Sequence, residues 1–108
     1  MSEELEELEE LEEVEETEPT ILDKVKQALR IKSEAFDMEI EDLICACKVD
    51  LALAGIKKIE DADALIQRAI IVYAKANFGL ENPDSDKYQR SYDLLKMSMA
   101  LAGDYIVE

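Results

Sequence analysis

Apolar residues recur at steps of three and four along most of the chain, which is the spacing of amphipathic helices. The clearest stripe consists of Phe36, Ile40, Leu43, Ile44, Cys47, Leu51 and Ala54. A shorter stripe before it consists of Leu22, Val25 and Leu29. The last stripe consists of Tyr88, Tyr92, Leu95, Met99 and Ala102. The pattern predicts an all-α fold, a small bundle of about four helices with a short first helix and a long second one.

Residues that start and stop helices stand between these stripes. Thr20 and Asp23 have the spacing of a capping box, and Ser33 is expected to cap the second helix. We expect the third and fourth helices to be capped by Asp61 and by Asp84 or Ser85. The expected helix stops are Gly55, Gly79 and Gly103, with a short tail after the last. Residues 55–61 have room for one short extended piece.

The third helical segment, "DADALIQRAIIVYAKANFG", is unusually apolar, because residues 69–74 carry no polar side chain except the Tyr73 hydroxyl. Such a helix is either central to the fold or pressed against another chain. Helical geometry places Ile71 between Arg68 and Lys75, on a side expected to face water. Ile71 is therefore either an incidental exposed aliphatic residue or a contact with a neighbouring subunit.

The N-terminal segment is acidic and of low complexity. Residues 1–18 hold 11 of the 27 acidic residues and none of the 12 basic ones, so the other 16 acids leave residues 19–108 a net charge of −4. The aliphatic residues of "EELEELEELEEVEE" recur every three positions and fan across a helix instead of forming a seam. The glutamates also repel one another. We predict a disordered or fractionally helical leader, 1–18, before a helical domain, 19–108.

Candidate chemistry is sparse. The chain has no His, and its three Gly residues form no phosphate-binding loop. Cys45 and Cys47 point to nearly opposite sides of a helix, so they are predicted to be reduced structural thiols, with Cys47 buried and Cys45 partly exposed. The acidic residues 37–42 lack the glycine turn of a calcium loop and fit the first turns of a helix. We therefore predict no enzyme activity, no cofactor and no metal.

The charge and the apolar pattern narrow the class of protein further. Clustered Lys and Arg, which phosphate-driven nucleic-acid binding requires, are missing. No apolar run is long enough to span a bilayer, and no secretory signal is visible. The sequence thus predicts a soluble protein of the cytoplasm, and its charge leaves open a protein that lines a DNA passage, where repulsion keeps DNA mobile.

Three segments taken together resemble the small head–tail connector proteins of tailed bacteriophages, including prophage copies described as DNA-packaging proteins. They are "ILDKVKQALRI…EAFDMEIEDLICAC", "DALIQRAIIVYAKANFG" and "NPDSDKYQRSYDLLKMSMALAGDY". The resemblance spans about residues 20–105 and rests on packing patterns and turn residues, with no catalytic signature among them. The leader lies outside it.

The resemblance implies a structural subunit made in the bacterial cytoplasm and built into the virion at the head–tail junction. There it implies a ring of about a dozen copies below the portal protein, which extends the DNA channel and receives neck or tail-completion proteins. DNA passes such a ring without sequence-specific contacts. The resemblance names no interface residues. From periodicity alone we take Ile71, Tyr73, Tyr88 and Tyr92 as candidates for the subunit interface.

A second reading of the sequence is a non-phage helical interaction module, or an acidic inhibitor that acts through its Glu-rich leader. Within the connector reading, the leader is either a solubilising spacer or a docking arm for a basic surface on a neck partner. The sequence leaves both pairs of alternatives open.

Overall fold

The computed structural model describes residues 19–79 and 82–106, and every regular element in these ranges is helical. The elements are α2 (Ile21–Leu29), the 3₁₀ helix η1 (Glu34–Phe36), α3 (Asp37–Leu53), α4 (Ala64–Asn77), α5 (Ser85–Leu101) and α6 (Gly103–Ile106). The prediction of a small all-α bundle is confirmed. The leader, 1–18, lies outside the described residues, so its predicted disorder stays a prediction.

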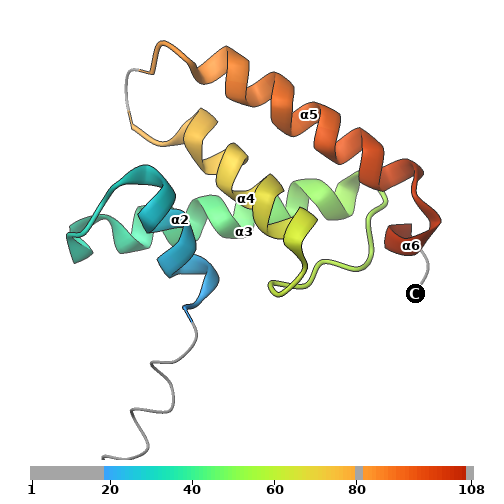
Figure 1. Cartoon of the computed structure of the whole chain (residues 1–108), viewed down its shortest axis with the longest axis horizontal. Coiled ribbons are helices and arrows are strands. Elements are labelled where there is room, and N and C mark those ends of the chain that lie inside the picture. The colour runs from blue at the N-terminus through green and yellow to red at the C-terminus, as the bar shows by residue number, and fades with distance from the viewer. Residues whose placement is uncertain (1–18, 80–81, 107–108) are drawn as a thin grey trace, which may run out of the picture.

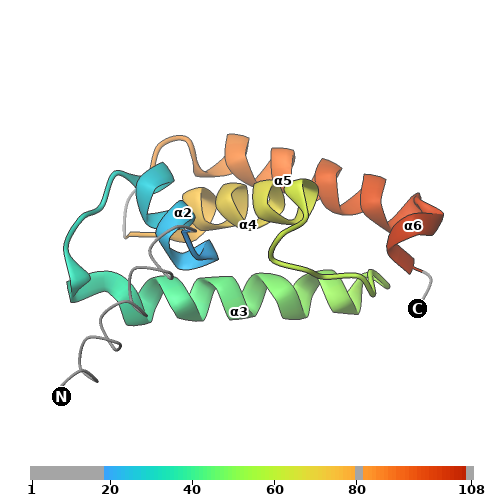
Figure 2. The same ribbon diagram turned by 60° about the horizontal axis from the view of Figure 1, so that its bottom comes forward.

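Helix α4 occupies the centre of the bundle, where it packs against α2, α3 and α5. Figure 2 shows α3 along one side of the subunit, with α2, α4 and α5 on the other side. Helices α3 and α5 run in the same general direction, whereas α4 runs back (Figure 1). The largest fully buried side chains come from several of these elements and form one core: Tyr92, Ile40, Leu51, Ile56, Ile66, Ile70 and Met99.

The central position of α4 explains its unusual sequence. Six of its residues are buried: Ile66, Ala69, Ile70, Val72, Ala74 and Ala76. A helix with neighbours on three sides has little surface left for water, so it needs few polar residues. Of the two alternatives that the apolar run allowed, the structure shows the central helix.

The predicted starts of α2 and of the second helix are confirmed. The Thr20 N–H donates to Asp23 Oδ2 and the Asp23 N–H donates to Thr20 Oγ1, each at 3.1 Å, which is a complete capping box. Ser33 Oγ accepts from the Ala35 N–H at 3.0 Å and starts η1, which leads directly into α3. These local bonds fix where the first two helices begin.

Left-handed residues end three of the helical segments. Gly55 has φ 97° after α3 and Gly79 has φ 89° after α4, as expected for glycine stops. The residue after α2, Arg30, is also left-handed at φ 64°. The Ile31 N–H then donates to Lys26 O at 2.9 Å, which satisfies a carbonyl of the last turn of α2.

Two predicted caps differ in the structure. Asp84 stands at the N-cap position of α5, but its side chain makes no capping hydrogen bond, and the Ser85 hydroxyl donates to Ala76 O instead. Asp63, not Asp61, caps α4, because its Oδ1 accepts from the N–H groups of Leu65 at 2.8 Å and Ile66 at 3.2 Å. Residues 61 and 62 form a turn before the helix, and there the Asp61 carboxylate pairs with Lys48 at 2.7 Å. Both Asp residues suit a cap, and the preceding turn decides between them.

The chain after α5 also differs from the expectation. Helix α5 ends at Leu101 with an extended Ala102, and Gly103 starts the short helix α6 instead of ending α5. Residues 56–60 form neither a helix nor a strand. The N–H groups of Lys57 and Lys58 donate to the Tyr105 carbonyl at 2.6 and 3.1 Å, so this segment and α6 hold each other in place.

Candidate subunit interface

The four residues proposed for the interface from periodicity lie mostly against the subunit's own core. Ile71 and Tyr73 are half-buried and pack on the core cluster. Tyr88 is half-buried, with the ammonium groups of Lys75 and Lys87 at 5.4 and 5.5 Å from its ring centroid. Tyr92 is fully buried and meets Tyr73 edge to face, with ring centroids 5.0 Å apart. The structure therefore brings two of the four together, inside the subunit.

Tyr92 is the centre of a polar link between α3 and α5. Its hydroxyl donates to Asp50 Oδ2 at 2.6 Å, and the buried Cys47 thiol donates to that hydroxyl at 3.8 Å. Lys96 Nζ reaches the same Asp50 oxygen at 2.8 Å, and its ammonium lies 5.2 Å from the Tyr92 ring centroid. The link ties the two helices to each other in addition to their packing against α4.

The environment of this link sets the protonation of its members. Burial raises the pKa of the Cys47 thiol to about 12, and burial followed by the Asp50 carboxylate raises the pKa of Tyr92. Partial desolvation acts to raise the pKa of Asp50, but hydrogen bonds from Lys96 and Tyr92 outweigh it, and the pKa lies below its usual value. At neutral pH the thiol and phenol are neutral, the carboxylate is ionised, and the thiol is a poor nucleophile.

A second polar contact fixes the C-terminal end. The Tyr105 hydroxyl lies 2.9 Å from both carboxylate oxygens of Asp63, the residue that caps α4. The bonds from Lys57 and Lys58 to the Tyr105 carbonyl join the same residue to the loop before α4. Tyr105 therefore anchors α6 across the N-terminal end of the central helix.

Helix α3 carries a second apolar stripe, on the side that faces away from the core. Its exposed apolar residues are Met38, Cys45, Val49 and Leu53, and the Leu53 side chain is 81% exposed. They recur at steps of seven and four, so they share one face of the helix. The exposure of Cys45 and the burial of Cys47 follow the sequence-based prediction. We call this surface the α3 outer face.

Helix α5 carries a comparable stripe on its own outer side. Leu94, Met97 and Leu101 are exposed, Leu101 to 79%, and their steps of three and four align them on one face. The buried Tyr92 and Met99 lie on the opposite side of the same helix. We call this surface the α5 outer face. Figure 2 shows α3 along one side of the bundle and α5 with α4 on the other side, and on each of the two helices the exposed row lies opposite the buried residues.

Sequence periodicity did not predict these two faces, because the stronger apolar stripe of each helix is the one that meets the core. The signal was present in the sequence: α3 is apolar on both sides, and Leu94, Met97 and Leu101 have helical spacing of their own. Single exposed leucines are ordinary on a protein surface. Aligned rows of exposed apolar residues on two helices form larger apolar patches than a monomeric protein usually exposes.

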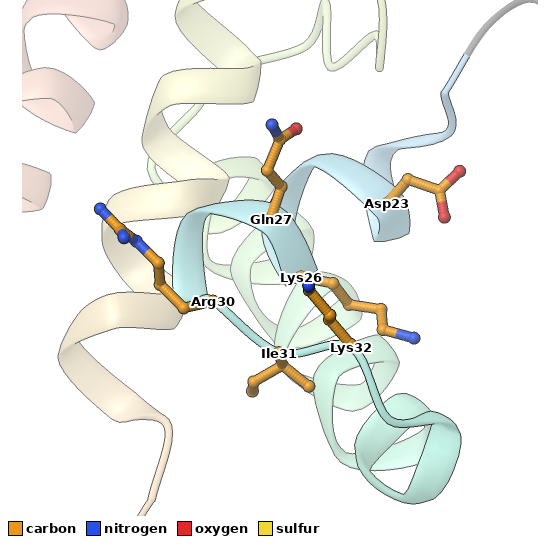
Figure 3. A pocket seen from close by; sticks show the side chains of 6 residues that line it. All are labelled: Asp23, Lys26, Gln27, Arg30, Ile31 and Lys32. Carbon is orange, nitrogen blue, oxygen red and sulfur yellow. The ribbon is translucent and has the colours of Figure 1, made fainter.

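A hollow beside the C-terminal end of α2 is lined by Asp23, Lys26, Gln27, Arg30, Ile31 and Lys32. Figure 3 shows these side chains along α2, from Asp23 in its first turn to Arg30, Ile31 and Lys32 after its end. Lys26 is already paired with the Asp37 carboxylate at 2.7 Å. The hollow is a positively charged surface with no nucleophile or general acid–base pair.

Other kinds of site are absent from the part of the chain that the structure describes. Residues 19–79 and 82–106 contain no group of three or more Cys, Asp or Glu side chains placed to hold a metal ion. None of the described helices has both the length and the apolar character needed to cross a membrane. The features that stand out are therefore the two exposed apolar faces.

The bundle and its outer faces define a small helical protein with exposed apolar surface of the kind that contacts other proteins. Comparison with known families agrees with this class, because the model of the phage connector protein family matches residues 21–106, most of the chain. The chain belongs to the phage connector protein family. Searches among curated proteins and among solved structures gave no significant match.

Proposed function

We propose that the chain is a structural subunit of a phage virion that forms a ring below the portal protein, at the junction of head and tail. The ring has about a dozen copies, as the resemblance to head–tail connectors implies, and neighbouring copies meet through two different faces. It extends the DNA channel and offers a surface to neck or tail-completion proteins. Its work is assembly, without catalysis or a cofactor.

The observation that carries this proposal is the family match over residues 21–106. Two apolar outer faces on different sides of one small subunit support it, because a head-to-tail ring needs two distinct contact surfaces on every copy. The charge of residues 19–108 supports a passage through which DNA moves, since a body with a net charge of −4 has no excess of basic groups to grip phosphates.

Sedimentation of the protein alone and with its portal protein tests the proposal. We expect the portal to recruit several copies into one complex, and we expect assembly without portal to be weaker, because many phage rings form only on their template. A species that stays strictly monomeric at every concentration, even with portal present, would contradict the proposal.

A further inference from the structure

We propose that the α3 outer face of one copy docks onto the α5 outer face of the next copy, with the two helices parallel. In this register Asp42, Cys45, Val49 and Leu53 of one copy face Arg90, Leu94, Met97 and Leu101 of its neighbour, respectively. The inference rests on the proposed ring assembly and adds the surface, the direction and the register of the contact.

The lengths and spacings of the two rows match. The α3 row has steps of three, four and four residues, and the α5 row has steps of four, three and four. Each row therefore covers about three helical turns, roughly 16 Å, and presents one side chain per turn to its partner. Steps of three and four are the spacing with which two helices form a packed seam. Val49 and Leu53 are exposed, as are Leu94, Met97 and Leu101, so each row offers apolar surface to bury.

The charges match only when the helices are parallel. Within the proposed contact, the α3 row begins with the exposed acid Asp42, one turn after Met38, and the α5 row begins with the exposed base Arg90, one turn after Asp86. A parallel contact brings the acidic start against the basic start and leaves both apolar ends together. An antiparallel contact would set Asp42 against Leu101 and leave it desolvated without a partner.

Asp42 and Arg90 are also available for this pairing. Neither forms an ion pair or a side-chain hydrogen bond with any residue in the ranges 19–79 and 82–106. A pair formed across a subunit boundary, beside buried apolar residues, selects register and partner more than it adds affinity.

The arrangement of helices within the subunit favours the same direction. Helices α3 and α5 run in the same general direction in both views (Figures 1 and 2), and the exposed row of each helix lies opposite its buried residues. Neighbours in a ring of about a dozen copies differ by a rotation of about 30°, which leaves helix directions nearly unchanged. The α3 of one copy therefore meets the α5 of the next in parallel. Two-fold pairing of one outer face with itself would instead set Asp42 against Asp42, or Arg90 against Arg90, if the helices were parallel. If they were antiparallel, it would set an acidic or basic start against an apolar end.

A disulfide test uses the native thiol of the α3 outer face. The Leu94→Cys variant places a second thiol opposite Cys45 of the neighbouring copy, and facing positions of packed helices are within disulfide reach. Mild oxidation of the assembled protein should give a ladder of dimers, trimers and longer chains, because each copy offers one thiol on each side. Cys47 does not compete, since it is buried.

Two matched variants control this experiment. Adding Cys45→Ser should remove the ladder and leave dimers at most. Arg68→Cys, at an exposed position of α4 outside both faces, should give no ladder although it carries the same number of thiols. Assembled particles of the Leu94→Cys variant that show no ladder would overturn the proposed interface and leave the ring itself standing. A protein that remains monomeric with portal present would overturn both.

Charge reversal tests the register separately. Asp42→Arg and Arg90→Asp should each weaken association of the copies about fivefold or more, and the double variant should recover most of the loss. These positions are exposed and lack partners within the subunit, so each variant should fold like the native chain. A double variant that assembles no better than the single ones would overturn the Asp42–Arg90 register.

Discussion

The link around Tyr92 gives a sharp test of how the subunit is held together. The Tyr92→Phe substitution removes one hydroxyl and keeps the ring, including its edge contact with Tyr73. It takes away the 2.6 Å bond to Asp50 and the acceptor of the Cys47 thiol.

The magnitude follows from the contacts that remain. A hydrogen bond to a charged group contributes about 1.5–3 kcal/mol to stability. The Asp50 side chain is 38% exposed and keeps Lys96 at 2.8 Å, so solvent and Lys96 compensate for part of the loss. The thiol is a weak donor and adds a few tenths of a kcal/mol. We expect the free energy of unfolding to fall by about 1–2 kcal/mol, which lowers Tm by roughly 5–12 °C in a domain of this size.

Thermal unfolding followed by circular dichroism, with urea titration beside it, measures this effect. Tyr88→Phe is the matched control, because the Tyr88 hydroxyl has no hydrogen-bond partner among the described residues. The difference in the free energy of unfolding between wild type and Tyr92→Phe should depend on pH. The hydrogen bonds hold the pKa of Asp50 below its ordinary 3.8, so their contribution is present above that pH and is lost as the pH falls through the lower, folded-state pKa. A loss below about 0.3 kcal/mol at neutral pH, or a difference unchanged in acid, would refute this reasoning.

Three further predictions concern the rest of the chain. Gly55→Ala should destabilise the subunit by about 1–2 kcal/mol, because φ is 97° at Gly55 although there is space for a Cβ. Gly103→Ala, which also has space for a Cβ but no left-handed φ, should be neutral or slightly stabilising. Equal effects of the two substitutions in urea titrations would contradict this prediction. Cys45 should react with a thiol reagent in the folded protein, and Cys47 should react only on unfolding. Because burial raises the pKa of the Cys47 thiol from 9.0 to about 12, the stabilising contribution of the buried thiol is present below pH 9 and is lost as the pH rises towards 12. Cys47→Ser should reduce this alkaline loss in denaturation curves, and Cys45→Ser should not. A peptide of residues 1–18 should show little helix by circular dichroism at about pH 7 and more at about pH 4, where the glutamates are protonated; strong helix at neutral pH would contradict the prediction for the leader.

Local rules were sufficient for much of the fold. The capping box of Thr20 and Asp23 and the stops at Gly55 and Gly79 depend on residues within one turn of each other, so the sequence alone locates them. Tertiary contacts decide the rest. Asp61 and Asp63 are equally good caps by type, and Asp63 is used where Tyr105, 42 residues away, also reaches it. The helical turn after Gly103 depends on the same contact.

The candidate interface was harder to predict, for a related reason. A periodic pattern shows which residues share a face, but not which face meets the core when a helix has two apolar faces. Periodicity made Tyr92 a candidate for the subunit interface, yet the ring is buried and Asp50 and Cys47 satisfy its hydroxyl inside the subunit. Leu53 and Leu101 looked unremarkable until the packing placed them outside. Three-dimensional packing was therefore needed to separate core from contact surface.

Electron microscopy of the full chain mixed with its portal protein tests the central claim most directly. We expect a closed ring of this subunit seated on the portal, with a channel along its axis. Portal particles that carry no added density, with the chain left as free monomers at every concentration, would contradict the assignment as a ring-forming connector.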